Sequence, residues 1–409
     1  MDYRAVFASA LGIVSPWEVV EIRFSREQHQ LDIWVDFPRG STFACPACGR
    51  PGAKVYDTDQ KTWRHLNFFQ YRTYLHARVP RVECPGGCPV RQVQVPWARP
   101  RSEFTLYFEG LIMVLARDMP VKAIAELVGE HDTRLWRILD HYVNEARAKQ
   151  DYSQVRRVGV DETAAKRGHN YISLFVDLDA PQLLFATPGK GSDTVAAFSE
   201  DLQAHGGRPE DIETVCCDLS PAYIAGVKAF FSQAKLVFDR FHVMKIINAA
   251  VDEVRRDESK ENALLKKTRY LWLKNPSKLT AKQRKKLESL KYQHLDTVRA
   301  YNLKLSFQDF FTQPDRAAGE EFLKRWYHWA THSKLVPMIQ AAYTIKDHWE
   351  GILNWFESRV SNSILEGINS LIQAAKARAR GYRNVKTLIT MAYIIGSRLD
   401  YGLPKYCLC

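Results

Sequence analysis

Three acidic residues have the types and the settings that divalent-metal chemistry requires. Asp161 ends the run RRVGVD and Asp218 ends TVCCD, so we expect both to project from the carboxyl ends of buried strands. Glu366 lies in SNSILEGINSLIQAAKARARGYRN, a helical stretch that becomes strongly basic. Three carboxylates brought together could hold two Mg²⁺ or Mn²⁺ ions, and basic residues beside them could hold a phosphodiester. This combination indicates metal-dependent cutting or joining of nucleic acid.

Other acidic residues compete for the same role. Glu162 would point to the opposite side of a continuing strand, and Asp177 and Asp179 stand at a hairpin end, where acids are common. Asp239 is the serious rival because it also follows a strand-like run, AKLVF. We interpret Asp239, together with His242 one helical turn later, as a supporting pair.

Four cysteines form two metal-type pairs, Cys45-Pro-Ala-Cys48 and Cys84-Pro-Gly-Gly-Cys88. Tight turns of this kind let two thiolates reach one tetrahedral Zn²⁺. The segments KVYDTD, TWRHLNFF and RTYLHARVPRVEC between them are typical of strands, which predicts a zinc ribbon. The alternatives are a thioredoxin-like redox pair or unliganded cysteines, but no βαβ pattern surrounds the CxxC motif.

Two histidines lie between the cysteine pairs. His65 or His76 could replace one cysteine as a ligand, but four thiolates already fill a tetrahedral site, so a structural or DNA-facing role is favoured. The remaining cysteines carry less information: Cys216 and Cys217 are expected to pack inside a strand, and Cys407 and Cys409 stand at the C-terminal end.

Residues 103–145 carry three helical periods. In MPVKAIAELVGEHDTRLWRILDHYV, Gly129 separates two short helices and Asp132 suits an N-cap. In the second helix Thr133, Arg134 and Arg137 face away from the core, which is the layout of a DNA-recognition helix. An ordinary helical hairpin is the alternative, and the neighbouring zinc ribbon favours DNA reading. The residues expected to face the core are Leu135, Ile138, Leu139 and Tyr142.

The elements that must position the acids begin near residue 155. RRVGVD, YISLFVDL and QLLFATPG are typical of three strands, followed by a helix near residues 192–204. TVCCD and AKLVFD are two more strands, each followed by a helix, SPAYIAGVKAFF and RFHVMKIINAAVDEVRR. A three-strand meander followed by two βα units is the order of an α/β, RNase-H-like mixed sheet. Its first strand is central and its fourth lies beside it, which predicts that Asp161 and Asp218 are neighbours.

About 100 helical, basic and aromatic residues then interrupt this domain, and the fold resumes near residue 350. On the helix that carries Glu366 we expect one polar and one apolar side, with Gly367 permitting close packing near the site. The polar side comprises Glu366, Asn369, Gln373, Lys376 and Arg380, and the apolar side comprises Ile364, Ile368, Leu371 and Ala375.

Charge and composition agree with a polyanion partner. The chain has 58 basic and 46 acidic residues, a net charge of +12, and residues 254–304 hold fifteen Lys/Arg and five Asp/Glu, a net +10. A solvated helix face is the ordinary explanation of such a run, and the candidate metal site shifts the balance toward DNA. No apolar run is long enough for a membrane helix, and the metal-type cysteines predict a reducing cytoplasm.

The predicted organisation therefore has six parts. They are an N-terminal segment (1–40), a zinc ribbon (41–95), a helix-turn-helix domain (96–150), the first part of the catalytic domain (151–253), a helical basic insertion (254–345) and the C-terminal part of the catalytic domain (346–409).

Nearly the whole chain resembles the bacterial insertion-sequence transposases of the DDE type, specifically the ISL-three family. The segments VGVDETAAKRGHNY, CCDLSPAY, VFDRFHV and SNSILEGINSLIQAAKARARGYRN carry the resemblance. It implies that Asp161, Asp218 and Glu366 are the catalytic triad. Asp161 would bridge two Mg²⁺ ions, and the site would cut at the end of the element and join the released 3′-OH to target DNA.

The resemblance also implies the partners. The recognition helix and zinc ribbon would read terminal inverted repeats, and cutting two ends together implies at least a homodimer on DNA, in association with the nucleoid. Two alternatives stay open: a non-catalytic DNA-binding regulator derived from a transposase, and a nuclease built on the same sheet. The residues expected to contact DNA are Thr133, Arg134, Arg137, Asn369, Lys376, Arg378 and Arg380.

Overall fold

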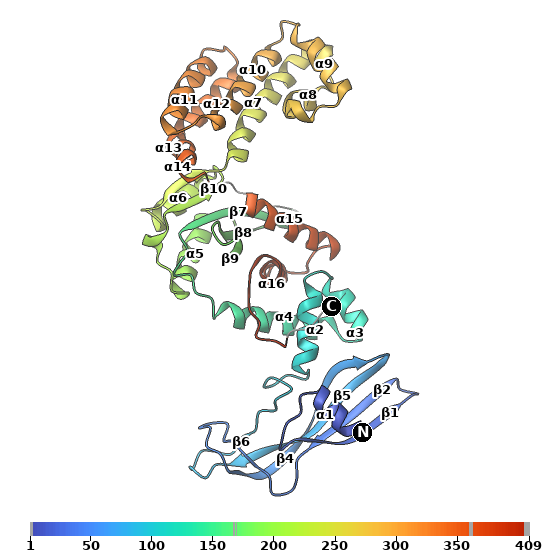
Figure 1. The fold of residues 1–409 in the computed structure, drawn as a ribbon. Coiled ribbons are helices and arrows are strands. Elements are labelled where there is room, and N and C mark those ends of the chain that lie inside the picture. The colour runs from blue at the N-terminus through green and yellow to red at the C-terminus, as the bar shows by residue number, and fades with distance from the viewer. Residues whose placement is uncertain (1–2, 167, 169, 360–362, 405–409) are drawn as a thin grey trace. The chain divides into compact units, whose positions relative to one another are not determined.

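The computed structural model describes residues 3–166, 168, 170–359 and 363–404 (Figure 1). The chain divides into two compact units, one formed by Met1–Arg147 with Leu399–Cys409 and the other by Ala148–Arg398. Cys407 and Cys409 lie outside the described residues. Each unit is described by itself below.

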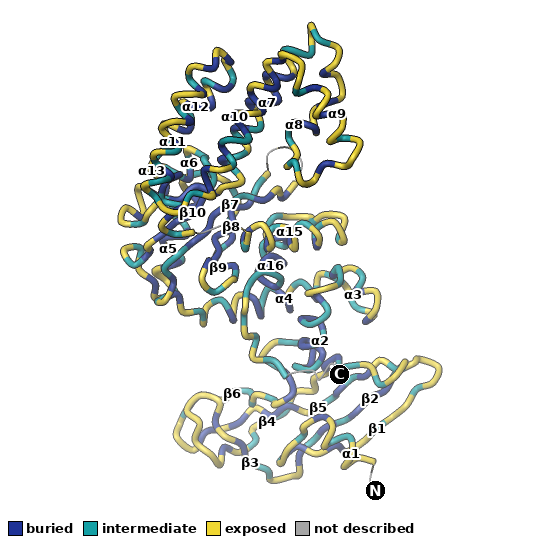
Figure 2. The backbone as a smooth tube through the Cα atoms, turned by 45° about the horizontal axis from the view of Figure 1, so that its top comes forward, coloured by how far each residue is buried: buried dark blue, intermediate teal, exposed yellow. Residues whose placement is uncertain are grey.

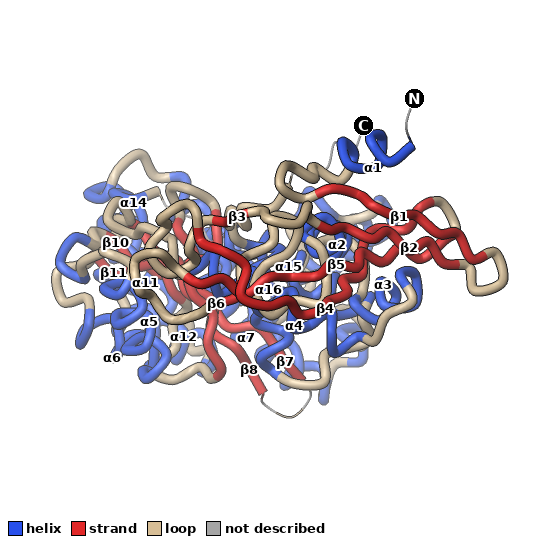
Figure 3. Tube along the Cα trace, turned by 90° about the horizontal axis from the view of Figure 1, so that it is seen from below, coloured by secondary structure: helices blue, strands red, loops and turns tan. Residues whose placement is uncertain are grey.

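A mixed β-sheet forms most of the first unit. Its strands follow the order β1-β2-β5-β4-β3, with the short β6 pairing on β5. Alternate residues of β5 point into a core that contains Leu75, Ala77 and Val79. The long β4–β5 ribbon is visible in Figure 3. The elements are α1 (Tyr3–Ala10), β1 (Glu18–Ser25), β2 (Gln30–Asp36), β3 (Thr42–Phe43), β4 (Ala53–Phe68), β5 (Tyr71–Glu83) and β6 (Arg91–Gln92).

This sheet differs from the predicted ribbon in two ways. The segments KVYDTD and TWRHLNFF are not separate strands but parts of the single sixteen-residue β4. In addition, the predicted boundary after residue 40 falls inside the sheet, because β2 pairs in parallel with β5. Only the tertiary structure reveals that β2 belongs to this sheet.

Three helices complete the first unit: α2 (Leu106–Ala116), α3 (Val121–Val128) and α4 (Asp132–Arg147). Gly129 ends α3 in the left-handed conformation, with φ of 70°, as the prediction of a break at this glycine requires. The four residues predicted to face the core from the last helix, Leu135, Ile138, Leu139 and Tyr142, are all buried.

The second unit contains a five-stranded mixed sheet with the order β11-β10-β7-β8-β9. The first three strands in sequence form an antiparallel meander, and β10 lies parallel to both β7 and β11. This is the predicted topology, with β7 at the centre. Most of β8 and all of β10 are buried (Figure 2). The strands are β7 (Arg157–Lys166), β8 (Asn170–Asp177), β9 (Gln182–Pro188), β10 (Thr214–Cys217) and β11 (Lys235–Phe238).

The helices of the second unit include a large insertion that shares its core with the sheet. Trp272, Tyr301 and Trp326 of the insertion belong to the same buried cluster as Val160 of β7. The predicted boundary after residue 253 falls within a single helix, α7, which starts directly after β11. The helices are α5 (Ser192–Ala204), α6 (Pro221–Phe230), α7 (Arg240–Glu261), α8 (Arg269–Leu273), α9 (Ala281–Lys291), α10 (Asp296–Gln308), α11 (Arg316–Thr331), α12 (Val336–Asp347), α13 (Trp349–Leu353), α14 (Trp355–Ser358), α15 (Ser363–Arg378) and α16 (Val385–Gly396).

Side chains from later in the chain cover both edges of this sheet. At β11, the amide of Asn354 donates to the carbonyl of Leu236 at 2.9 Å. At β9, the hydroxyl of Tyr393 on α16 accepts from the backbone N–H of Ala186 at 2.9 Å. An edge strand otherwise exposes unpaired backbone groups. These contacts also fix the chain on either side of α15.

Candidate functional site

Asp161 lies on the central strand β7, which continues to Lys166, so the prediction that Asp161 ends the strand is wrong. The parallel partner β10 pairs with β7 only as far as Gly159. Asp161 therefore lies beyond the segment of β7 that pairs with β10, although it still pairs with Leu174 of β8. Its carboxylate accepts two hydrogen bonds. The backbone N–H of Glu162 donates to one carboxylate oxygen at 2.9 Å and the Asn369 amide to the other at 3.1 Å. Burial raises the pKa of the Asp161 carboxyl to about 6.

Asp218 directly follows β10, as predicted. The parallel register aligns Cys216 with Gly159, so continuing it by two residues places Asp218 level with Asp161. Asp218 is half-buried, and its carboxylate accepts the backbone N–H of Ser220 at 2.9 Å. Its negative charge also contributes to the raised pKa of Asp161. These two carboxylates are thus electrostatic neighbours on adjacent strands.

Asp239 and His242 form the predicted pair. Asp239 is buried at the N-terminus of α7, and its carboxylate lies 3.2 Å from Nδ1 of His242. This hydrogen bond raises the pKa of the imidazole, and the charges of Asp161 and Asp218 raise it further. The histidine consequently belongs to the same electrostatic cluster as Asp161 and Asp218.

Glu366 lies in the first turn of α15, with its side chain exposed. One turn along this helix, Asn369 is the residue that touches Asp161. The three acids do not converge as closely as the cysteines. Among the residues that the structure describes, only the cysteine group has three or more potential ligands within 4.8 Å of one another. Helix α15 thus lies against β7 through Asn369, while the carboxylate of Glu366 is exposed to solvent.

Polar contacts fasten α15 along β7. The Gln373 amide donates to the Thr163 hydroxyl at 2.6 Å and to the Ala164 carbonyl at 3.1 Å. The Lys376 ammonium donates to the same carbonyl at 2.6 Å. The sequence did not indicate Thr163, because a threonine within a strand is unremarkable by itself. The contacts explain why Asn369, Gln373 and Lys376 lie on one side of the helix.

Three expectations about this helix are wrong. Arg380 lies beyond the end of α15, in a left-handed conformation with φ of 54°. Leu371 is 55% exposed rather than packed. A Cβ added at Gly367 would meet nothing within 4 Å, so this glycine does not permit close packing. The buried side comprises Leu365, Ile368, Ile372 and Ala375.

A basic groove of about 530 Å³ lies at the C-terminal end of α15. The predicted Lys376 and Arg380 line it, together with Lys166 and Arg383, which the sequence reasoning missed. The Lys166 ammonium donates to the Arg383 carbonyl at 2.7 Å and so joins the end of β7 to this loop. Arg378 is exposed but does not line the groove. Four cations around one groove give it the positive charge that a phosphate backbone attracts.

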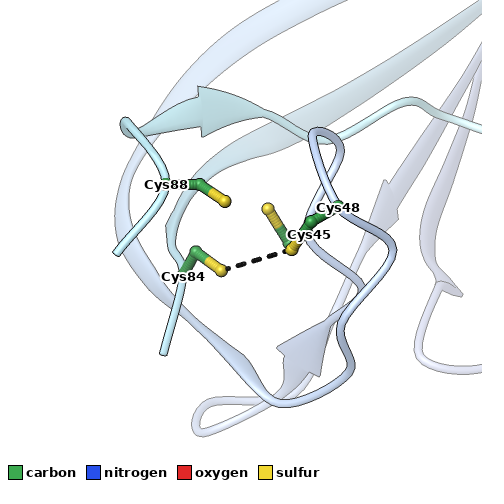
Figure 4. Close-up of side chains that lie close together, drawn as sticks. All are labelled: Cys45, Cys48, Cys84 and Cys88. Carbon is green, nitrogen blue, oxygen red and sulfur yellow. Dashed lines mark hydrogen bonds between the residues drawn. The ribbon is translucent and has the colours of Figure 1, made fainter. Parts of the chain in front are cut away.

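The four cysteines of the first unit converge on one point (Figure 4). The sulfurs of Cys48 and Cys84 lie 3.7 Å apart, close to the roughly 3.8 Å expected between two sulfurs that each bind zinc at 2.3 Å in a tetrahedron. Cys45 follows β3 and Cys84 follows β5, strands that both pair with β4. The sheet thus brings the two knuckles to the same end.

The thiols of this cluster compete for protons. The backbone N–H of Gly86 donates to the Cys84 sulfur and lowers the pKa of that thiol to about 6. Cys88 keeps its proton, because hydrogen bonding to Cys48 and Cys84 raises its pKa to about 12. A divalent cation removes this competition, since all four groups can then ionise. The donor set fits structural Zn²⁺.

The two histidines between the knuckles have other partners. His65 lies next to α2, where its Nδ1 is 2.8 Å from the Thr105 hydroxyl. Burial, with the charge of Arg64, lowers the pKa of His65 to about 4. His76 bridges Asp32 and Thr62 across neighbouring strands. Neither belongs to the cysteine cluster, in agreement with the expectation that they are not zinc ligands.

The three predicted DNA contacts of α4 differ in solvent exposure and in their contacts within the protein. Arg137 is exposed, and Thr133, also exposed, is 2.9 Å from the ring of His131. Arg134 is only half-exposed, because it pairs with Glu103 and Glu130 and lies over the Phe104 ring. This arginine therefore has a structural role in α4 as well as its predicted outward position.

Buried Arg64 links β4 to the same helices. Its guanidinium donates to the Val128 carbonyl at the end of α3 at 3.3 Å and lies 3.6 Å from Glu130. Its backbone pairs with Glu103 and Thr105. The zinc-bearing sheet and the helix-turn-helix are consequently joined within the first unit. Sequence reasoning missed Arg64, since a single arginine in a strand carries no signal.

No helix among the described residues is long and apolar enough to cross a membrane. The structure thus combines a four-cysteine zinc module, a helix-turn-helix and an RNase-H-like sheet with neighbouring acids at its centre. These features define a DNA-processing protein with separate binding and catalytic parts.

Comparison with known proteins identifies the family. Residues 158–392, more than half of the chain, match the ISL3 family described as "Transposase". Residues 93–143 match "Helix-turn-helix domain of transposase family ISL3", and residues 41–88 match "zinc-finger of transposase IS204/IS1001/IS1096/IS1165". The chain belongs to the ISL3 family of insertion-sequence transposases, and it is a DNA transposase.

Two relatives show how far the similarity extends. The transposase for insertion sequence element IS1001 of Bordetella parapertussis is 28% identical over 358 residues, covering 85% of this chain and 87% of the relative. The transposase for insertion sequence element IS1557 of Mycobacterium tuberculosis is 29% identical over 386 residues, covering 85% of each. The similarity thus spans both units.

Proposed function

We propose that this transposase cleaves and joins DNA with Asp161, Asp218 and Glu366, which together hold two Mg²⁺ or Mn²⁺ ions. The observation that supports this most is the hydrogen bond between Asn369 and Asp161. It sets α15 against the central strand, with Glu366 three residues before Asn369 and so on the same side of the helix. Three acids from distant parts of the sequence would thereby border one region.

The donor set fits a hard divalent cation. Carboxylate oxygens are the ligands that Mg²⁺ prefers, and beside them lies the buried amide oxygen of Asn369, which has no hydrogen-bond partner among the described residues. Bound Mg²⁺ would supply activation of a water molecule, and later of a DNA 3′-OH, for in-line attack on a phosphodiester. The remaining chemistry belongs to the side chains themselves.

Asp161 and Asp218 provide the central negative charge, and His242 moderates it. The raised pKa of His242 keeps a larger fraction of this imidazole protonated near neutral pH. Its positive charge favours the ionised form of Asp161. Asp239 holds the ring in place through Nδ1. We therefore assign Asp239 and His242 to support of the acids rather than to direct metal binding.

The DNA strand would follow the basic groove next to α15. Lys376, Arg380, Lys166 and Arg383 line this groove, and they would neutralise phosphates on either side of the cleaved bond. Arg378 lies on the exposed side of α15 and would contribute long-range attraction. This assignment extends the predicted contacts by two residues.

The first unit would read the terminal inverted repeats. Arg137 and Thr133 are exposed near the start of α4, the helix that would enter the major groove. The two ends of an element must be cut together, so we propose a homodimer or larger assembly on DNA. The catalytic chemistry and the end recognition would thus lie in different compact units.

The test is a strand-transfer assay with labelled duplexes that carry the element's end sequence, taken from inverted repeats that flank the gene. We expect Asp161→Asn, Asp218→Asn and Glu366→Gln each to lower Mg²⁺-dependent cleavage and joining by at least about 1,000-fold. Asp179→Asn is the matched control, because Asp179 is an exposed hairpin acid paired with Arg157. It should retain activity.

Two results would contradict the proposal. Full strand transfer by any of the three triad variants would remove that residue from the site. Specific binding of the ends by the wild-type protein, with no cleavage in Mg²⁺ or Mn²⁺, would instead indicate the regulator that the sequence left open.

A further inference from the structure

Asn369 occupies an unusual position beside Asp161. Its amide nitrogen donates to a carboxylate oxygen of Asp161 at 3.1 Å. Its amide oxygen is buried and has no hydrogen-bond partner among the described residues. Buried polar atoms in folded proteins nearly always have a partner. An oxygen that lacks one, next to a candidate metal ligand, therefore points to a donor that binds there.

The orientation of this amide is fixed by its neighbour. Exchanging the nitrogen and oxygen would bring the amide oxygen against an ionised carboxylate and would leave the buried nitrogen without an acceptor. The nitrogen therefore faces Asp161. The oxygen must point to another part of the same site.

The helix holds Asn369 at this place without help from an ion. One turn further along α15, the Gln373 amide bonds to Thr163 and Ala164 of β7. Ile368 and Ile372 are buried on the other side of the helix. Since polar contacts hold one side of α15 to β7 and buried apolar side chains hold the other side, the amide oxygen is preorganised.

We propose that Asn369 is a positioning residue of the metal site, which holds Asp161 through its nitrogen and accepts a hydrogen bond from an ion-bound water through its oxygen. The proposal rests on the proposed function, because it requires a divalent ion at Asp161. It also reassigns Asn369, which the sequence predicted as a DNA contact. Both of its polar atoms face the site, so neither is free for a phosphate.

The chemistry of the partner follows from the ion. Mg²⁺ and Mn²⁺ sites usually keep several water ligands, and each such water is a strong donor. A neutral amide oxygen accepts this hydrogen bond without adding charge to a site that already contains carboxylates. Partners of this kind outside the ligand set typically change metal affinity by about 10–100-fold when removed.

The experiment measures Mn²⁺ binding to the full-length protein without DNA, by the loss of the free-ion electron paramagnetic resonance signal. We compare wild type with Asn369→Leu, which keeps the approximate volume and removes both polar atoms. Gln373→Met is the matched control, since it removes an amide of the same helix that bonds to β7 away from Asp161. Asp161→Asn is the reference for loss of the site.

We expect Asn369→Leu to weaken Mn²⁺ binding by about tenfold, and Gln373→Met by less than about threefold. Wild-type affinity in Asn369→Leu would overturn the inference about Asn369. If Asp161→Asn loses Mn²⁺ binding while Asn369→Leu does not, the proposed function survives without this inference. If Asp161→Asn binds like wild type, the proposed metal site itself is wrong.

A second variant keeps the test decisive if Asn369→Leu does not fold. Asn369→Asp places a carboxylate against Asp161, so the metal-free protein should melt at a lower temperature than wild type. Mn²⁺ should then raise the melting temperature by more than it does in wild type, because the ion relieves the repulsion. An equal rise in both proteins would contradict the proposed place of Asn369.

Discussion

The two candidate metal sites of this transposase differ in how completely the protein assembles them. The sulfur atoms of Cys45, Cys48, Cys84 and Cys88 lie within 4.8 Å of one another, whereas Asp161, Asp218 and Glu366 do not converge to that distance. The cysteine site is built from two tight turns at one end of one sheet. The acidic site takes its residues from two strands and a helix that lie far apart in the sequence.

Charge accounts for this difference. An isolated thiol is mostly protonated at neutral pH, so the folded sheet can bring four of them together with little charge repulsion. In this cluster the pKa of Cys84 is lowered and that of Cys88 is raised, so the four thiols do not all carry a charge at once. Carboxylates are charged at neutral pH and repel one another, and the raised pKa of Asp161 reflects both burial and its acidic neighbours. This difference indicates that zinc binds to four sulfurs that already lie close together, whereas catalytic ions would have to draw the three carboxylates closer.

Brief chelation should produce the largest difference between the two candidate metal sites. A short EDTA treatment followed by buffer exchange should lower strand transfer by at least about 100-fold, because oxygen ligands release Mg²⁺ readily. Added Mg²⁺ should restore activity. Zinc content, measured by mass spectrometry, should stay near one per chain throughout, because four thiolates hold zinc tightly. Loss of zinc in step with activity would break the comparison.

Removing one thiolate should affect only the first unit. We expect Cys84→Ser to lose zinc and to destabilise that unit by about 3–5 kcal/mol, because the metal's binding energy contributes to folding. Specific end binding should fall with it. Mn²⁺ binding at the acidic site should not change, and Cys88→His, which keeps a metal ligand, should retain most of the zinc. Full zinc content in Cys84→Ser would contradict the assignment.

The first unit should also respond to acid through His65. Its pKa in the folded protein is about 4, below the usual value of about 6.5, so the unfolded chain takes up the proton first. Stability should be complete above pH 6.5 and should fall by about 1–3 kcal/mol between pH 6.5 and pH 4. Urea unfolding at several pH values measures this, at constant zinc.

The matched variant for this prediction is His65→Gln, which cannot be protonated. Its unfolding free energy should depend less on pH than that of wild type over the same interval. Equal pH dependence in both proteins would show that other groups, such as the zinc thiolates, dominate the acid response.

The smallest expected effect separates two arginines of α4. Arg137→Ala should weaken binding of the end sequence by about 5–10-fold and leave the melting temperature unchanged, since one lost DNA contact costs about 1 kcal/mol. Arg134→Ala should lower the melting temperature because it breaks ion pairs with Glu103 and Glu130. Fluorescence anisotropy at fixed salt and thermal unfolding measure both quantities. If Arg137→Ala instead lowers the melting temperature and Arg134→Ala weakens DNA binding, then Arg134 is the DNA contact and Arg137 the structural residue.

Much of this architecture could be predicted from local sequence signals. The two cysteine motifs, the break at Gly129 and the order of strands around Asp161 and Asp218 each depend on a few neighbouring residues. Turn chemistry and hydrophobic periodicity express local preferences, and local preferences can be read from the chain. For this reason the zinc module, the helix-turn-helix and the strand order of the RNase-H-like sheet are as predicted.

The rest depended on contacts between residues that are distant in sequence. The pairing of β2 with β5, the burial of Arg64 and the ion pairs of Arg134 have no local signature. The same holds for the hydrogen bond between Asn369 and Asp161, since the sequence predicted Asn369 only as a DNA contact. Glu366 shows the limit most clearly, because its helix could be predicted but its exposure could not.

The sequence by itself determined which residues are candidates for the chemistry: four thiols at knuckle spacing, and three carboxylates among strand and helix patterns. Only the tertiary structure decided how close the side chains of each set lie to one another. The two cysteine turns lie at the same end of one sheet, so forming the sheet is enough to bring their sulfurs together. The hydrophobic core of the first unit stabilises that sheet. Carboxylates on separate elements repel one another, so packing brings their strands and helix together without bringing the three carboxylates as close as the sulfurs.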